Sequence, residues 1–306
     1  MIAQLCTIAA INQLLCDPLR YQFMQNALIG MLMLGIVTGC IGAYVVVRGM
    51  AFMTDALGHA ILPGVAVAYL NGGVHGPLLL GAAVAGSITA LVIGFFTRGG
   101  KLREDTAIGI VFTGALALGL MILSLHSATA TDLETLLVGN ILALSGSDLL
   151  AILVVGLAIL LLIRIFYKEL LIVSFDPVLA ATLQYPVEGL RYLLLLMLAM
   201  TAVIAIQAVG VILIAAMMVT PAATAWLLVR RLNVMMIVGA AICCFCGVFG
   251  VMLSYYLSVN AGIDVSASAV VVVTMTLLFV LAYLFAPKRG LLWNALQTRQ
   301  TVPSGG

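Results

Sequence analysis

Residues 48–64 read RGMAFMTDALGHAILPG, and the apolar sequence on both sides makes this the most informative stretch of the chain. Asp55 and His59 stand four residues apart, so on a helix of 3.6 residues per turn their side chains lie one above the other on one face. A carboxylate and an imidazole at that spacing can hold one cation together. Gly58 allows close approach to a neighbouring helix, and Pro63 with Gly64 loosens the backbone hydrogen bonds that follow.

Two interpretations of this pair are open. Ionisable groups inside a membrane span are costly and by default mark an ion or substrate path, which makes Asp55 and His59 candidate metal ligands. In the alternative, Asp55 caps the start of a helix and His59 donates a hydrogen bond to a neighbouring carbonyl. The chain has only three histidines, and this one lies beside an acid in an apolar run, which favours the first interpretation.

The composition is that of a protein that crosses a membrane many times. Of its 306 residues 64% are hydrophobic and 8% are charged, whereas charged residues make up about a quarter of a soluble domain. A span needs about 20 apolar residues, so we predict an all-α polytopic membrane helical bundle of nine spans, with eight or ten as the alternatives. The predicted spans are 23–47, 50–70, 77–97, 106–125, 148–166, 190–210, 211–229, 234–258 and 266–286.

The basic residues predict the orientation, because Lys and Arg favour cytoplasmic loops. If residues 287–290 are cytoplasmic, nine alternating spans place every basic residue except Arg20 on the cytoplasmic side. We therefore expect an outer amino-terminal segment (1–22), a membrane domain (23–290) surrounded by lipid, and a cytoplasmic tail (291–306) whose polar sequence predicts disorder. The net charge of +2 and the scattered basic residues argue against nucleic acid as a partner.

The predicted outer surface carries a few polar features without a fixed role. Residues 127–147 form the longest outer connection and contain Asp132 and Glu134 but no basic residue. In one interpretation these acids raise the local concentration of divalent cations or contact a partner protein. In the other, residues 127–147 are an ordinary solvated loop. His75 and His126 fall at outer span ends, where they either load metal or are ordinary surface imidazoles.

A second informative stretch, SFDPVLAATLQYPV, occupies residues 174–187. Asp176 followed by Pro177 is a strong helix start, and Pro186 ends the element after about two turns. The sequence predicts a short amphipathic helix, about 176–185, between two spans on the cytoplasmic side. It is either a connector at the membrane surface or a contact for another protein.

These motifs resemble a known family. The pattern Arg48-x-Met50-x4-Asp55-Ala-Leu-Gly-His59-Ala-x-Leu-Pro-Gly64 is similar to the signature of the permease subunits of bacterial ABC importers for manganese, zinc and iron, the ABC-3 permeases. Similarity continues through residues 207–211 and 220–225 and runs from about residue 18 to 290. The stretch 104–110 is more similar to the manganese and iron members than to the zinc members.

The resemblance implies a fold and partners. It implies a type II ABC importer-like bundle in the bacterial cytoplasmic membrane, without a permanent cofactor. It also implies that Asp55 and His59 meet the same two residues of a second permease and that the four side chains pass the divalent metal. The second permease is an identical copy or a paralogue. The other partners implied are a separate ATPase and an extracytoplasmic metal-binding protein. The helix at 176–185 resembles the family's coupling helix, which carries over Asp176, Pro177, Ala180, Ala181 and Gln184, the last standing where the family usually has Gly.

Other classes of protein are less well supported by the sequence. The sequence contains no Gly-x4-Gly-Lys-Ser/Thr loop to bind ATP phosphates, so the energy for transport must come from elsewhere, and it contains no His-Glu-x-x-His metalloenzyme motif. An ion-coupled secondary metal transporter is the runner-up, but it needs acids along its spans, where Asp55 is the one good candidate. Cys243, Cys244 and Cys246 form either a soft-metal site or, as we favour, small packing residues.

Overall fold

The computed structural model describes residues 18–72, 77–100, 102–125, 141–261 and 265–286, which contain helices and no strand. Nine of the helical segments are long and apolar enough to cross a membrane, which confirms the predicted number of spans within these ranges. The tail, His75, His126, Asp132 and Glu134 lie outside the described residues. The main helices are α3 (Gln22–Val47), α4 (Ala51–Ala60), α5 (Leu62–Gly72), α6 (Leu78–Thr97), α7 (Glu104–Ser124), α9 (Gly146–Ile165), α10 (Tyr167–Phe175), α11 (Pro177–Thr182), α12 (Val187–Val209), α13 (Val211–Leu228), α14 (Leu232–Ala261) and α15 (Ala267–Phe285), with short 3-10 turns η2 (Pro18–Arg20), η4 (Arg98–Gly100) and η5 (Ile141–Ala143).

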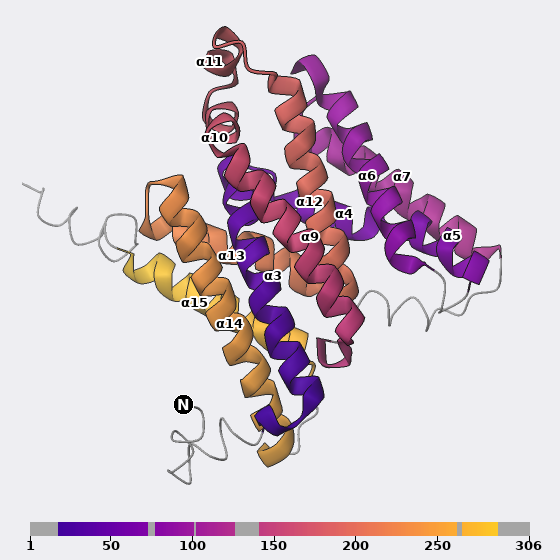
Figure 1. Ribbon diagram of the computed structural model, residues 1–306, viewed down its shortest axis with the longest axis vertical. Coiled ribbons are helices and arrows are strands. Elements are labelled where there is room, and N and C mark those ends of the chain that lie inside the picture. Colours follow the sequence, from indigo (N-terminus) through magenta and orange to yellow (C-terminus); the bar gives the residue numbers. More distant parts are fainter. Residues whose placement is uncertain (1–17, 73–76, 101, 126–140, 262–264, 287–306) are drawn as a thin grey trace, which may run out of the picture.

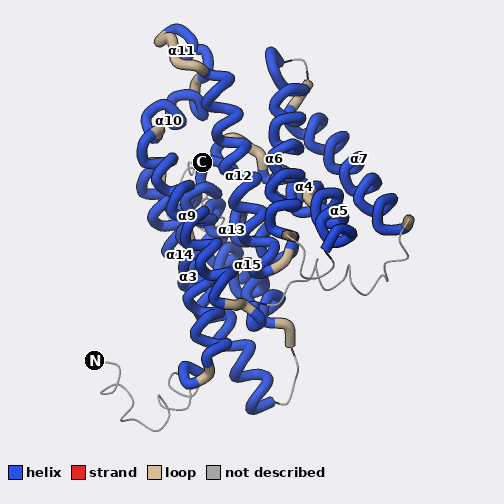
Figure 2. The backbone as a smooth tube through the Cα atoms, turned by 45° about the vertical axis from the view of Figure 1, so that its right-hand side comes forward, coloured by secondary structure: helices blue, strands red, loops and turns tan. Residues whose placement is uncertain are grey.

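The helices form two groups with α4 and α12 between them (Figures 1 and 2). Helix α3 packs against α9, α13 and α14, and α15 joins α13 and α14, whereas α5, α6 and α7 pack on one another. Helix α4 contacts α7 and α6 from one group and α13 from the other, and α12 contacts α6 and α9. The helix that carries Asp55 and His59 therefore lies at the junction of the two groups.

Small residues let α3 approach its neighbouring spans closely. A Cβ added at Gly39 would stand 2.4 Å from Ala240 Cα, and one at Gly42 would stand 2.1 Å from the Met218 carbonyl oxygen. Both distances are shorter than any real contact, so α3 can touch α13 and α14 only with glycine at these positions. Close backbone approach of this kind is how membrane helices gain packing energy in a solvent as apolar as their side chains.

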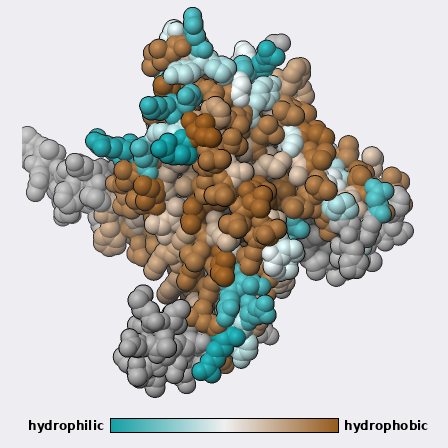
Figure 3. Space-filling model, in the orientation of Figure 1, coloured by the Kyte–Doolittle hydropathy of each residue, from teal (hydrophilic) through white to brown (hydrophobic). Residues whose placement is uncertain are grey.

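The exterior of the molecule is mostly apolar around the middle of the bundle and more polar toward its ends (Figure 3). Large exposed side chains such as Leu157 on α9, Leu80 on α6 and Leu277 on α15 are each about 60–65% exposed. Exposed apolar side chains around a bundle of this length are the expected lining toward lipid.

The predicted boundary between the sixth and seventh spans falls at Gly210. This residue ends α12 and starts α13 with φ 84° and ψ 168°, a conformation that only glycine adopts readily. Nearby, Pro221 inside α13 cannot donate to the Met217 carbonyl, which instead faces the Cys243 thiol at 3.8 Å. Cys243 and Cys246 are buried in the helical bundle, and packing stays the role that we favour for these cysteines.

Candidate functional site

Helix α4 presents the predicted pair on one stripe. Its buried face is formed by Met53, Thr54, Leu57 and Gly58, whereas Phe52 and Asp55 are exposed and His59 is partly buried. Residues 52, 55 and 59 repeat at helical spacing, so they share one side of the helix. Within the described residues, the structure thus leaves Asp55 exposed and His59 partly covered on the same side of α4.

The structural alternatives for this pair do not fit the geometry. The residue at the N-cap position of α4 is Met50, one turn before Asp55, and no side chain caps the helix. His59 Nδ1 is buried and has no hydrogen-bond partner in the described structure, and the imidazole lies edge-on to the Phe112 ring with centroids 5.6 Å apart. A buried ring nitrogen without a partner costs free energy, so a ligand that uses it would relieve that cost.

The ligand set is incomplete in one copy of the chain. The described residues hold no cluster of three or more His, Cys, Asp or Glu side chains suited to a metal ion. Asp55 and His59 supply two ligands, whereas a closed transition-metal site needs four or more. Any such site at α4 therefore needs donors from outside the described part of the chain.

The glycine in the motif has a steric reason. A Cβ on Gly58 would stand 2.7 Å from Val211 Cγ1, so the absence of a side chain lets α4 contact the start of α13 beside Gly210. The break between α4 and α5 falls at Ile61, two residues before Pro63, within the stretch that was predicted as one span. Gly64 then approaches α6, where an added Cβ would lie 2.0 Å from the Gly81 carbonyl oxygen.

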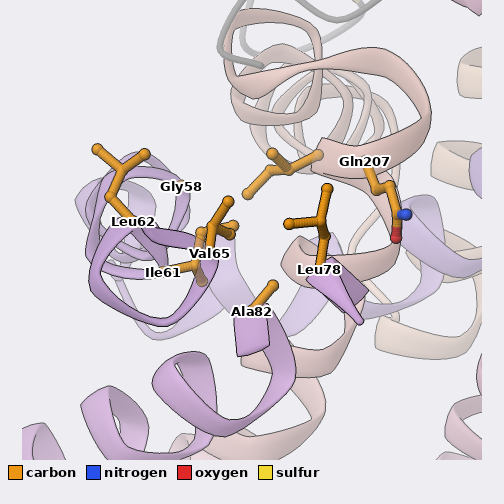
Figure 4. A pocket seen from close by; sticks show the side chains of 8 residues that line it. Gly58, Ile61, Leu62, Val65, Leu78, Ala82 and Gln207 are labelled. Carbon is orange, nitrogen blue, oxygen red and sulfur yellow. The ribbon is translucent and has the colours of Figure 1, made fainter. Parts of the chain in front are cut away.

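A small pocket lies beside this break (Figure 4). It has a volume of about 70 Å³, enough for a few water molecules. The motif contributes Gly58, and Gln207 is the one polar residue among those that line the pocket. With a single polar group the pocket offers no ligand set of its own, so the exposed stripe of α4 remains the better candidate.

A charge cluster that sequence reasoning missed ties four helices together at the end of the bundle that carries Arg48 and Glu104. Arg191 in the first turns of α12 donates to Glu104 Oε1 over 2.9 Å and to the Thr97 carbonyl of α6 over 3.0 Å. Nη2 of Arg48, which lies between α3 and α4, is 3.7 Å from the same Glu104 oxygen. Burial lowers the pKa of Arg48, and the nearby carboxylate of Glu104 opposes that shift. Glu104 and Asp105 also occupy the first turn of α7, where the positive end of the helix dipole favours carboxylates.

The predicted short helix is present as α11, between α10 and α12. Asp176 is its N-cap and accepts a hydrogen bond from the Leu179 amide over 2.9 Å, and Pro177 takes the first position. The helix ends in a Schellman motif, in which the Tyr185 amide donates to the Ala180 carbonyl and the Gln184 amide to the Ala181 carbonyl.

Gln184 occupies the left-handed position of that motif. Its φ is 60°, and it is the only non-glycine residue with positive φ in the described ranges. Glycine is the usual residue there because a Cβ is strained in this conformation. The conformation therefore gives a physical reason why glycine suits this position. The chain forms the same turn with glutamine there.

Helix α11 lies at a tip of the molecule (Figure 1), and the exposed side chains in and beside it are largely apolar. Phe175 is 62% exposed, Val178 73% and Leu183 53%, and Ala181 is also exposed. Ala180 differs because it is fully buried against the rest of the chain, so its side chain supports the helix from inside. Its exposed neighbours are the ones available for a partner protein.

Three comparisons with known proteins bear on this geometry. The profile of the ABC 3 transport family matches residues 20–286. The chain is 43% identical over 285 residues to the manganese transport system membrane protein MntC of Halalkalibacterium halodurans, covering 92% of this chain and 94% of that protein. It is 36% identical over 287 residues to the chelated iron transport system membrane protein YfeC of Yersinia pestis, covering 94% of each. The solved structure described as PsaBC from Streptococcus pneumoniae in complex with Fab matches with a TM-score of 0.77 and 37% identity, over 94% of this chain and 99% of that chain.

Proposed function

Because the chain belongs to the ABC 3 transport family, we propose that it is the permease subunit of an ATP-driven importer for a divalent transition metal. The relatives named for manganese and for chelated iron make these two metals the first candidates for the cargo, with zinc as the third. The chain is a multi-pass protein of the bacterial cytoplasmic membrane, with nine candidate spans in the described residues. The metal is a substrate here and not a resident cofactor.

The observation that carries the proposal is the exposed stripe of α4. Asp55 is the one acid of the described spans that lies away from a span end, and His59 stands one turn further along the same face with Nδ1 unpaired. A carboxylate with an imidazole suits manganese, iron and zinc, and affinity alone does not select among them. The pair gives a dehydrated cation its first fixed ligands inside an apolar bundle.

A second copy of the permease would complete the ligand set. An isologous dimer with its twofold axis beside α4 brings two carboxylates and two imidazoles together, which supplies four ligands without any further acid. The exposed Phe52, one turn before Asp55, supports this arrangement because a second α4 would cover it. An identical copy is the simplest partner, and a paralogous permease with the same motif would serve equally.

Energy would come from a separate ATPase that docks on α11. The sequence has no phosphate-binding loop, and α11 offers an exposed apolar surface at the cytoplasmic tip. Helix α12 follows α11 and carries Arg191, which bonds to Glu104 beside Arg48. A movement of α11 would thus reach the start of α4 through this cluster. An outer metal-binding protein would deliver the cargo on the opposite side.

Uptake of radioactive manganese into cells tests the proposal. Asp55→Asn and His59→Gln should each abolish uptake while the amount of folded protein and its association with the ATPase stay normal. Asp105→Asn is the matched control, because Asp105 is an exposed acid at the start of α7 and should leave uptake unchanged. Normal uptake by both Asp55→Asn and His59→Gln would refute a role of the pair in transport.

A proton or sodium gradient is the competing energy source. A secondary transporter would keep its uptake when the ATPase gene is deleted and lose it when the gradient is collapsed. The proposed importer behaves in the opposite way, since uptake stops without the ATPase and survives brief collapse of the gradient. Measuring both conditions in one strain separates the two classes.

A further inference from the structure

A groove opens at the cytoplasmic end of the bundle between α9 and α14. It has a volume of about 570 Å³, and no residue of α4 or α11 lines it. Its polar lining residues are Arg164, Tyr167 and Asn233. Arg164 lies in the last turn of α9 and Asn233 is the second residue of α14, so both stand where their spans reach the cytoplasmic surface.

The remainder of the groove is apolar and lies deeper in the membrane. Leu160 is four residues before Arg164, and Ile237 is four residues after Asn233, and both line the groove. With a rise of about 1.5 Å per residue, these side chains lie roughly 6 Å further from the cytoplasmic surface than the polar ones. The groove therefore has a polar mouth on the water side and an apolar floor on the membrane side.

The mouth carries unpaired positive charge. Within the described part of the chain, Arg164 is exposed and forms no ion pair. The Tyr167 hydroxyl donates a hydrogen bond to Asn233 Oδ1, and this bond does not use the two hydrogens of the Asn233 amide nitrogen. Lys168, Arg230 and Arg231 are exposed within three residues of these lining residues, whereas Glu169, the adjacent acid, does not line the groove.

From this arrangement we infer that the groove binds an anionic phospholipid of the cytoplasmic leaflet. The phosphate accepts from the Arg164 guanidinium and the Asn233 amide, and an acyl chain lies along Leu160 and Ile237. A free phosphate would satisfy the mouth but would leave the apolar floor unused. The surrounding face is lined for lipid, since Leu161 on α9 and Ile237 on α14 are 58% and 69% exposed (Figure 3).

The bound lipid would connect two helices at the end opposite the outer loops. Helices α9 and α14 both pack on α3, and a lipid in the groove touches both at their cytoplasmic ends. A basic side chain near a membrane surface contributes about 1 kcal/mol of attraction to anionic lipid, which corresponds to roughly a fivefold preference at 25 °C. This preference is independent of the metal and of the ATPase.

Quenching by brominated lipids measures the preference directly. The full-length chain, with Trp226→Phe and Trp293→Phe, receives one indole through Ile237→Trp and is placed in vesicles of brominated phosphatidylglycerol or brominated phosphatidylcholine. Phosphatidylglycerol should bind at this indole about fivefold more strongly than phosphatidylcholine. Arg164→Gln should lower the ratio toward one, whereas the matched control Arg103→Gln should leave it unchanged. An indole introduced instead by Leu153→Trp, nearer the outer end of α9, should show a ratio near one.

Each other result overturns the inference. A ratio near one with Arg164 intact, or a ratio that Arg164→Gln does not lower, removes the anionic lipid site. Loss of the preference in excess inorganic phosphate would identify a free-anion site, and absence of quenching by either lipid would mean that protein covers the groove. If Arg164→Gln does not fold, Asn233→Leu replaces it and should lower the ratio while Arg164→Lys keeps it.

Discussion

Arg191 donates a hydrogen bond to Glu104 Oε1 over 2.9 Å, across 87 residues of sequence. This contact joins α12, which follows the short helix α11, to α7, which packs against α4. Arg48 lies 3.7 Å from the same oxygen and leads into α4. The tip of the molecule that carries α11 and the helix that carries Asp55 and His59 are thereby linked by one carboxylate.

Replacing that carboxylate should weaken the bundle and its coupling. Glu104→Gln leaves two largely buried guanidinium groups without an anionic partner, and a hydrogen bond to a charged group contributes roughly 1.5–3 kcal/mol. We expect a lower melting temperature of the purified protein and fewer metal ions transported per ATP hydrolysed. The matched control Asp105→Asn, one residue further along, should change neither quantity. Wild-type stability and coupling in Glu104→Gln would show that the cluster is incidental.

Gln184→Gly should stabilise the end of α11. The substitution removes the Cβ from a residue at φ 60°, where an L side chain costs about 1–2 kcal/mol in the left-handed conformation. The amide of Tyr185, which donates to the Ala180 carbonyl, should then exchange with solvent more slowly. Gln184→Ala keeps the Cβ and serves as the control, and equal exchange rates in the two variants would contradict the strain argument.

The ATPase contact is tested at the exposed side of α11. Val178→Arg and Ala181→Arg should each abolish copurification with the ATPase while insertion and stability remain normal, because both side chains are exposed. Ala180→Arg should instead destabilise the segment, since Ala180 is fully buried. Leu102→Arg places the same charge on another cytoplasmic connection and should leave copurification intact. Copurification of the Val178→Arg and Ala181→Arg proteins at wild-type levels would remove α11 from the interface.

The predicted orientation is tested by labelling single cysteines in a cysteine-free background. Arg230→Cys should react with a membrane-impermeant reagent only from the cytoplasm, and Ser145→Cys, at the start of α9, only from outside. The basic residues around α14 and the parity of nine spans require this result. Reaction of Arg230→Cys from outside would invert the topology.

Local features of the fold were predictable because they are encoded within a few residues. Asp176 with Pro177 predicts the start of α11, and Gly58 predicts the close approach of α4 to a neighbouring helix. The break before Pro63 follows from the missing amide hydrogen in the same way. In each case the sequence signal and its structural effect lie within one or two helical turns.

Contacts between distant residues were not predictable from a single sequence. Nothing in the spacing of Arg48, Glu104 and Arg191 shows that three helix ends meet. The burial of Ala180 was also missed, because α11 has only six residues, most of them apolar or small, and so has no clear inner face. The candidate ligands Asp55 and His59 could be found from the sequence. The other ligands of the proposed metal site would come from a second copy of the chain, which the sequence of one copy does not describe.

The number of metal ions per chain tests the central proposal most directly. The purified permease–ATPase complex, saturated with Mn²⁺ and freed of excess metal, is measured by elemental analysis, and electron spin-echo spectroscopy detects nitrogen coupled to the bound ion. We expect one manganese ion per two permease chains with coupling from imidazole nitrogen, and no bound manganese in Asp55→Ala or His59→Ala complexes that remain folded. One ion per single chain, or undiminished binding in both variants, would contradict a site shared between two copies of α4.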